Sequence, residues 1–241
     1  MDSTFYISLS GQLALQRRLD TIANNVANSS TAGFRAENVT FDSVISNASS
    51  APVAYAGTPE GSFALNSGAI TSTSNPLDVA VRGDAFLAVS TSAGTVYTRD
   101  GRMRLSTAGD LETISGQPFL DAGGAPIQIN PGNGTISISS KGEISQDGKR
   151  VATLGLFRLA PDSKLTRYEG SGLMPDRPAE PVVDFTANGV VQGHVENSNV
   201  NPMLEMTRLI SISRSFEAIS AMIDKADGTL NNAIRTLGSG R

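Results

Sequence analysis

Apolar residues recur with helical spacing at both ends of the chain. Near the C-terminus they follow one another at alternating intervals of three and four residues: Leu209, Ile212, Phe216, Ile219, Ile223, Ala226, Leu230, Ala233 and Leu237. This is the heptad pattern of a coiled-coil seam. A shorter stripe near the other end comprises Leu15, Leu19, Ile22 and Val26. The pattern therefore predicts two terminal helices that pack against each other or against neighbouring subunits.

The C-terminal stripe also carries signals for the start of its helix. Asn201 is a suitable N-cap, and Pro202 suits the first helical position, where no N–H donor is needed. Glu205 brings a negative charge into the first turn, near the positive end of the helix dipole. We expect this helix to run to Leu237 and the N-terminal helix to span Phe5 to Val26.

Between the two stripes the apolar period changes from helical to two. From residue 61 to residue 159, strand-like runs are separated by turn pairs such as Asp100-Gly101 and Asp147-Gly148. Such hairpin signals at short spacing are typical of antiparallel β-structure. A last hairpin around Asn188-Gly189 leads back to the C-terminal stripe. We predict an α+β fold, with long N- and C-terminal helices forming a coiled-coil stalk and a central, mainly antiparallel β domain.

The predicted domain boundaries follow these changes in pattern. Residues 1–38 form the N-terminal coiled-coil helix and the loop after it, and residues 39–75 form a linker or extended connection. Residues 76–180 form the central β domain. Residues 181–199 form the returning hairpin, and residues 200–241 form the C-terminal coiled-coil helix.

Composition and charge argue against two classes of partner. The chain has 241 residues, of which 39% are apolar, and a formal net charge of −4. It has no cluster of Lys and Arg that would release counterions from nucleic acid or hold an amphipathic helix on anionic lipid. No apolar run approaches the ~20 residues of a membrane span, and no cleavable signal peptide is visible. We therefore expect neither nucleic-acid binding nor membrane insertion.

Candidate catalytic and metal-binding residues are scarce. The chain has no cysteine, which excludes disulfides and thiolate metal sites. His194 is the only histidine, and no Ser or Cys motif accompanies it. Carboxylate pairs such as Asp100 with Asp110 lie in turn sequences, and the Gly-rich segments match no phosphate-binding pattern. We predict no catalytic residue, no metal and no cofactor, and therefore no enzymatic activity.

Three regions of the chain resemble known signatures. Residues 21–35, with Asn24-Asn25-Val26-Ala27-Asn28 and Gly33-Phe34-Arg35, resemble the N-terminal signature of the bacterial flagellar rod and hook proteins. Residues 193–217 resemble the C-terminal signature of that family, and residues 75–101 are similar to its β domain. The signature positions are Asn24, Asn25, Ala27, Asn28, Thr31, Gly33, Phe34, Asn199, Val200, Glu205, Phe216 and Glu217.

The resemblance implies a structural subunit of the flagellar basal-body rod. Such subunits assemble helically through their terminal helices into the hollow shaft that transmits torque from motor to hook. The short length and the Phe5-Tyr6-Ile7 start are most similar to proximal rod members, with distal rod members as the alternative. A secreted glycan-binding or peptidoglycan-modifying module is an alternative from a different class.

The resemblance also implies partners and a location. The partners are other proximal and distal rod subunits, the rod cap and the flagellar type III export apparatus, and the rod is a homo-oligomeric or mixed helical assembly. The location is the rod across the periplasm, reached without a cleavable signal peptide. The predicted assembly interface consists of the large stripe residues: Leu15, Leu19, Ile22, Val26, Leu209, Ile212, Phe216, Ile219, Ile223, Leu230 and Leu237.

Overall fold

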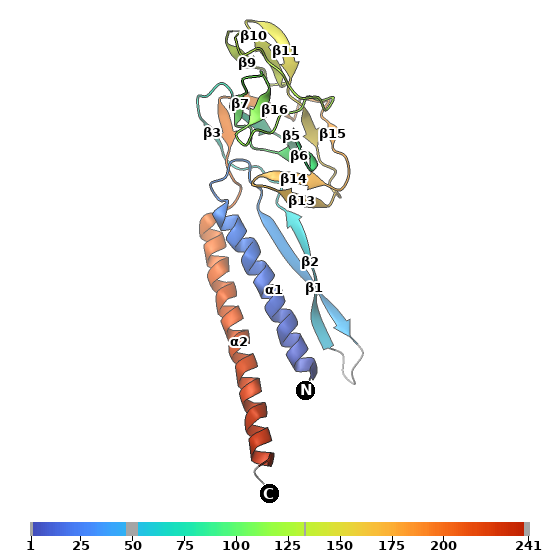
Figure 1. The fold of residues 1–241 in the computed structure, drawn as a ribbon, viewed down its shortest axis with the longest axis vertical. Coiled ribbons are helices and arrows are strands. Elements are labelled where there is room, and N and C mark those ends of the chain that lie inside the picture. Colours follow the sequence, from blue (N-terminus) through green and yellow to red (C-terminus); the bar gives the residue numbers. More distant parts are fainter. Residues whose placement is uncertain (1, 47–52, 133, 239–241) are drawn as a thin grey trace. The chain divides into compact units, whose positions relative to one another are not determined.

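The chain divides into two compact units. The computed structural model describes residues 2–46, 53–132 and 134–238 (Figure 1). Unit 1 comprises residues 1–27, 37–62 and 201–241, and unit 2 comprises residues 28–36 and 63–200. Both units are therefore built from segments that lie far apart in the sequence.

Unit 1 consists of two helices and a two-stranded β ribbon (Figure 1). Helix α1 (Asp2–Ala27) packs against α2 (Pro202–Gly238) and against strand β1 (Glu37–Ser46), which pairs with β2 (Val53–Phe63). The backbone N–H of Leu204 donates to Asn201 Oδ1 at 3.2 Å, so Asn201 caps α2 as predicted. Two terminal helices and the α+β class are thereby confirmed.

The predicted long coiled-coil stalk is wrong. Helix α1 has 26 residues and α2 has 37, and β1 packs on α1 as well. In the first half of α1, Gln12 Nε2 lies 3.5 Å from Ser220 Oγ, and a Cβ added to Gly11 would lie 3.8 Å from Ile219 Cδ1. A glycine and a glutamine provide no apolar knobs, so the α1 seam is limited to residues 15–26. The helices therefore pair as part of an α+β unit.

Unit 2 is a set of small antiparallel sheets. The largest has the strand order β13-β14-β6-β5-β12-β15, and a three-stranded sheet has the order β11-β10-β9. Three further pairs are β16-β4, β17-β3 and β7-β8. The strands are β3 (Ile70–Ser72), β4 (Val79–Arg82), β5 (Ala85–Thr91), β6 (Gly94–Thr98), β7 (Met103–Leu105), β8 (Leu111–Thr113), β9 (Ile136–Ile138), β10 (Glu143–Gln146), β11 (Lys149–Thr153), β12 (Leu156–Arg158), β13 (Leu165–Tyr168), β14 (Gly172–Pro175), β15 (Glu180–Pro181), β16 (Gly189–Gln192) and β17 (His194–Glu196).

The core of unit 2 lies on both faces of β5. Leu87 and Val89 pack into the larger apolar cluster, together with Phe119. Phe86 points the other way, into a second cluster that contains Phe157, because successive side chains of a strand alternate between its two faces. A strand covered on both faces is apolar at nearly every position, and residues 85–89 are all buried.

The core assignment predicts a large effect of truncating Phe119, which has no exposed surface. Phe119→Ala should lower the free energy of unfolding by about 3–5 kcal/mol, measured by urea denaturation of the purified chain. Val183 is 90% exposed, so Val183→Ala is the control and should change this free energy by less than ~0.5 kcal/mol. A Phe119→Ala chain as stable as the wild type would contradict the assignment.

Candidate functional site

The two predicted apolar stripes lie in unit 1, on the helices that pack together. Ile22 of α1 is buried, and the other stripe residues whose side chains are described are half-buried: Leu15, Leu19, Val26, Leu209, Ile212, Phe216, Ile219 and Ile223. The side chains of Leu230 and Leu237 lie outside the described residues. The described stripes are therefore only partly covered within one chain.

A second apolar surface was not predicted from the sequence. Met203, Met206 and Ile210 are 76%, 51% and 53% exposed, and their spacing of three and four residues brings them to one face of α2. Leu9 and Leu13 are likewise exposed on α1. Both helices of unit 1 therefore carry exposed apolar side chains in addition to the predicted stripes. The spacing was visible in the sequence, but it did not indicate which face of the helix is exposed.

Asn25 holds the start of β1 against the end of α1. Its side chain is almost fully buried, its Oδ1 accepts from the Glu37 N–H at 2.9 Å, and its Nδ2 donates to the Glu37 carbonyl at 2.8 Å. One amide thus satisfies both backbone groups of a strand residue, as a neighbouring strand would. This explains a signature position whose role the sequence did not reveal.

The loop after α1 belongs to unit 2 and is closely packed. Gly33 has a φ of +66°, and a Cβ there would lie 2.3 Å from the backbone nitrogen of Asp100, so another residue would not fit. Phe34 has no exposed surface, and the Arg167 guanidinium lies 4.1 Å from its ring centroid. The loop therefore requires glycine for its path and the aromatic ring for its packing.

Asn199 joins the two signature segments. Its Oδ1 accepts from the Ala36 N–H at 2.7 Å, and its Nδ2 donates to the carbonyls of Ala64 and Asn66 at 2.7 and 2.9 Å. The Asn199 backbone N–H also donates to the Phe34 carbonyl at 3.2 Å. The segment that leads to α2 is thereby attached to the segment that follows α1.

A fully buried ion cluster lies beside this junction. Glu196 Oε1 accepts from Arg35 Nη2 at 2.6 Å and from the Gly68 N–H at 2.8 Å. Glu196 Oε2 accepts from Arg99 Nη1 at 3.0 Å, and the three ionic side chains are all buried. The Glu196 carbonyl accepts from the Gly33 N–H at 2.8 Å as well. One residue thus joins the N-terminal loop, the β domain and the returning strand.

Burial and neighbouring charges compete at Arg99. Burial lowers the pKa of its guanidinium, the Glu196 carboxylate raises this pKa, and the positive charge of Arg35 lowers it again. Arg99 also donates to the carbonyls of Val81 and Gly83. The guanidinium therefore relies on Glu196 and on backbone carbonyls in place of water.

The remaining signature positions have varied surroundings. Asn28 accepts from Thr31 Oγ1 at 3.1 Å within the loop, and Val200 is buried. Glu205 is buried in the first turn of α2, and Asn24 and Phe216 are half-buried. Ala27 and Glu217 are exposed. The sequence did not indicate that Arg99 and Glu196 meet Arg35, because charged residues lie mostly at the surface.

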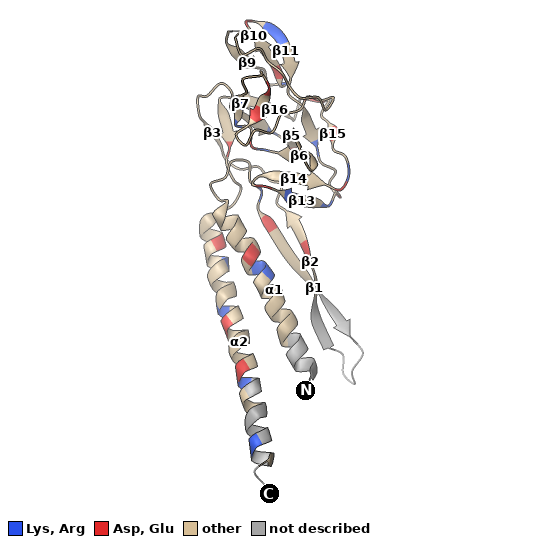
Figure 2. Ribbon diagram, in the orientation of Figure 1, with Lys and Arg blue, Asp and Glu red and all other residues tan. Residues whose placement is uncertain are grey.

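The described residues contain no group of three metal-ligating side chains. The half-buried His194 has its Nδ1 at 2.8 Å from the Gln192 carbonyl. Within the part of the chain that the structure describes, neither helix has an apolar stretch long enough to span a membrane. Figure 2 shows acidic and basic residues interspersed along α2.

Three family models match the chain. They describe the "Flagella basal body rod protein" at residues 5–35, the "Flagellar hook protein FlgE/F/G D1 domain" at residues 80–146, and the "Flagellar basal body rod FlgEFG protein C-terminal" at residues 191–236.

Full-length relatives agree with these models. The chain is 45% identical to the flagellar basal-body rod protein FlgF of Mesorhizobium japonicum over 99% of both chains. It is 44% identical to FlgF of Rhizobium meliloti over the whole of both chains. It is 30% identical to the flagellar basal-body rod protein FlgG of Bacillus subtilis, over 96% of this chain and 97% of the relative.

The ion cluster predicts that Glu196→Gln destabilises the chain strongly. The substitution leaves two buried guanidinium groups without an anion, which should lower the free energy of unfolding by about 3–5 kcal/mol in urea denaturation. The control is Glu143→Gln at the pair with Arg150, whose side chains are 41% and 63% exposed, and it should cost less than ~1 kcal/mol. Equal effects of the two substitutions would show that the cluster has no special role.

Proposed function

The chain belongs to the family of flagellar basal-body rod and hook proteins, and we propose that it is a structural subunit of the proximal flagellar rod. The observation that carries this proposal is the similarity to rod proteins named FlgF along the whole chain. FlgG, the distal-rod alternative, is less supported because the FlgG relative from Bacillus subtilis shares fewer identical residues with the chain.

A mechanical role agrees with the contacts between the segment that follows α1 and the segment that precedes α2. Helix α1 leads into the loop that contains Arg35, and α2 begins shortly after Glu196 and Asn199. Arg35 forms a buried ion pair with Glu196, and Asn199 is hydrogen-bonded to the residues on either side of Arg35. The segment that follows α1 and the segment that precedes α2 are therefore held together within unit 2, which suits a subunit that transmits torque.

The proposed assembly interface is on the helices of unit 1. It consists of the half-buried stripe residues together with the exposed Met203, Met206 and Ile210 of α2. A neighbouring subunit that covers these side chains gains the hydrophobic free energy that a single chain leaves unused.

The proposed partners follow from the rod role. They are other proximal and distal rod subunits, the rod cap and the flagellar type III export apparatus, and the location is the rod of the basal body across the periplasm. The proposed role is structural, without catalysis.

Removing α2 tests the proposal. A chain lacking residues 203–241 should be absent from purified basal bodies, and the cells that produce it should be non-motile, because half of the helix pair is missing. Unit 2 ends at residue 200, so the truncated chain should still unfold cooperatively in urea. Motility restored by the truncated chain in a strain that lacks the gene would contradict the proposal.

A single charge in the helix pair gives a more local test. Ile219→Asp should prevent incorporation into basal bodies without lowering expression or export, because burying an unpaired carboxylate is costly. Ser215→Asp is the matched control, since it adds the same charge at an exposed position one turn earlier. Immunoblots of basal bodies and swimming in soft agar measure the outcome, and normal motility of the Ile219→Asp strain would argue strongly against this interface.

A further inference from the structure

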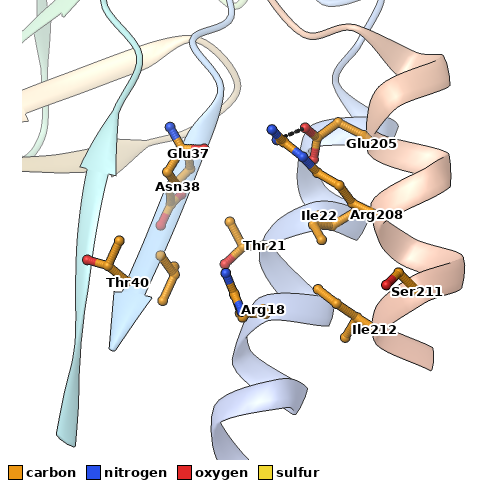
Figure 3. Close-up of a pocket in the computed structure, with 11 residues that line it drawn as sticks. Arg18, Thr21, Ile22, Glu37, Asn38, Thr40, Glu205, Arg208, Ser211 and Ile212 are labelled. Atoms are coloured by element: carbon orange, nitrogen blue, oxygen red, sulfur yellow. Dashed lines mark hydrogen bonds and ion pairs between the residues drawn. The ribbon is translucent and has the colours of Figure 1, made fainter. Parts of the chain in front are cut away.

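A groove in unit 1 is open to solvent between three elements. It has a volume of about 500 Å³ and is lined by α1, β1 and α2 (Figure 3). Ile22 and Ile212 contribute apolar surface, Thr21 and Ser211 contribute hydroxyl groups, and Glu205 and Arg208 contribute charges. An apolar wall with polar groups around it suits a long side chain that has an aliphatic stem and a polar end.

Glu205 is the unusual member of this lining. It is 5% exposed, and its Oε1 accepts from Arg208 Nη1 at 2.6 Å. Its Oε2 is buried and has no hydrogen-bond partner among the described residues. A buried carboxylate oxygen without a donor is costly, because it loses its hydration and gains nothing in exchange.

The chain itself shows how such a carboxylate is satisfied. Glu196, which is also buried, accepts from Arg35 on one oxygen and from Arg99 on the other. Glu205 has one cationic donor, Arg208, on Oε1. Its Oε2 has no donor among the described residues. By comparison with Glu196, the missing partner is a second cationic donor.

We propose that the groove between α1, β1 and α2 receives a lysine or arginine side chain from an adjacent rod subunit, with Glu205 as its acceptor. The proposal rests on the proposed rod function. Arg208 is 49% exposed, so its guanidinium can shift and admit a second donor to Oε2 at little cost in buried contacts. Arg18 also lines the groove, but its side chain is exposed and solvent screens its repulsion of the incoming cation.

The first test replaces Glu205 by glutamine, which keeps the shape and removes the charge. Glu205→Gln should fall at least tenfold in incorporation into basal bodies, measured by quantitative immunoblot. The free full-length chain should keep the wild-type unfolding temperature or exceed it, because the lost charge was only half paired. The matched control is Asp224→Asn, the same acid-to-amide change at an exposed position of α2, which should incorporate normally.

A second test measures whether the groove is filled. Ser211→Cys adds a single thiol to a chain without cysteine, at an exposed position of the groove lining. A maleimide should modify this thiol in the free chain and should react at least tenfold more slowly in purified basal bodies. This test decides the matter if Glu205→Gln prevents folding.

Two results would overturn the proposal: wild-type incorporation of Glu205→Gln, or a Ser211→Cys thiol that reacts equally fast in basal bodies and in the free chain. In both cases the wild-type chain and Asp224→Asn would still be found in the rod. If the rod function itself were wrong, these two chains would be missing as well, so the two failures are distinguishable.

Discussion

Unit 2 depends on one buried carboxylate, that of Glu196. Arg35 lies in the loop after α1, Arg99 directly follows β6, and Glu196 ends β17, so segments far apart in the chain meet at one side chain. Neither guanidinium can be buried at acceptable cost without this anion. A buried ion cluster often adds little stability compared with apolar packing. Its main effect here is to specify which segments come together, because the Glu196 carboxylate pairs with both arginines at once.

The elements that could be predicted have local signals. The apolar residues from Leu209 to Ile223 recur at helical spacing within one segment, and Asn201 lies immediately before Pro202, so the helix and its first residue could be read directly. The prediction of a long coiled coil was wrong because a coiled coil also depends on the partner helix, which here is α1. Gly11 and Gln12 lie near Ile219 and Ser220, and no pattern in α2 reveals this. Periodicity identifies a helix and its apolar face, but the partner that covers this face is determined by distant residues.

The sequence indicated which positions of the candidate site matter, but it did not indicate what each side chain contacts. The resemblance to rod and hook signatures indicated Asn25, Gly33 and Asn199, but the backbone groups that they satisfy or approach come from other segments. Arg35 and Glu196 are separated by 161 positions, and nothing in either neighbourhood indicates that the two charges are buried. Charged residues usually lie at the surface, so composition and spacing predict exposed side chains at these two positions, where the structure has a buried ion pair.

The two units each bury a carboxylate near the start of α2 in the sequence, and the two carboxylates differ in how fully they are paired. In unit 2 both oxygens of Glu196 have donors, and both faces of β5 are covered. In unit 1 one oxygen of Glu205 lacks a donor among the described residues, and Met203 with its neighbours on α2 is exposed. A partner that binds the folded chain at these groups stabilises the folded state. On the proposed assembly interface, a subunit that joins a polymer would therefore gain free energy at its helices.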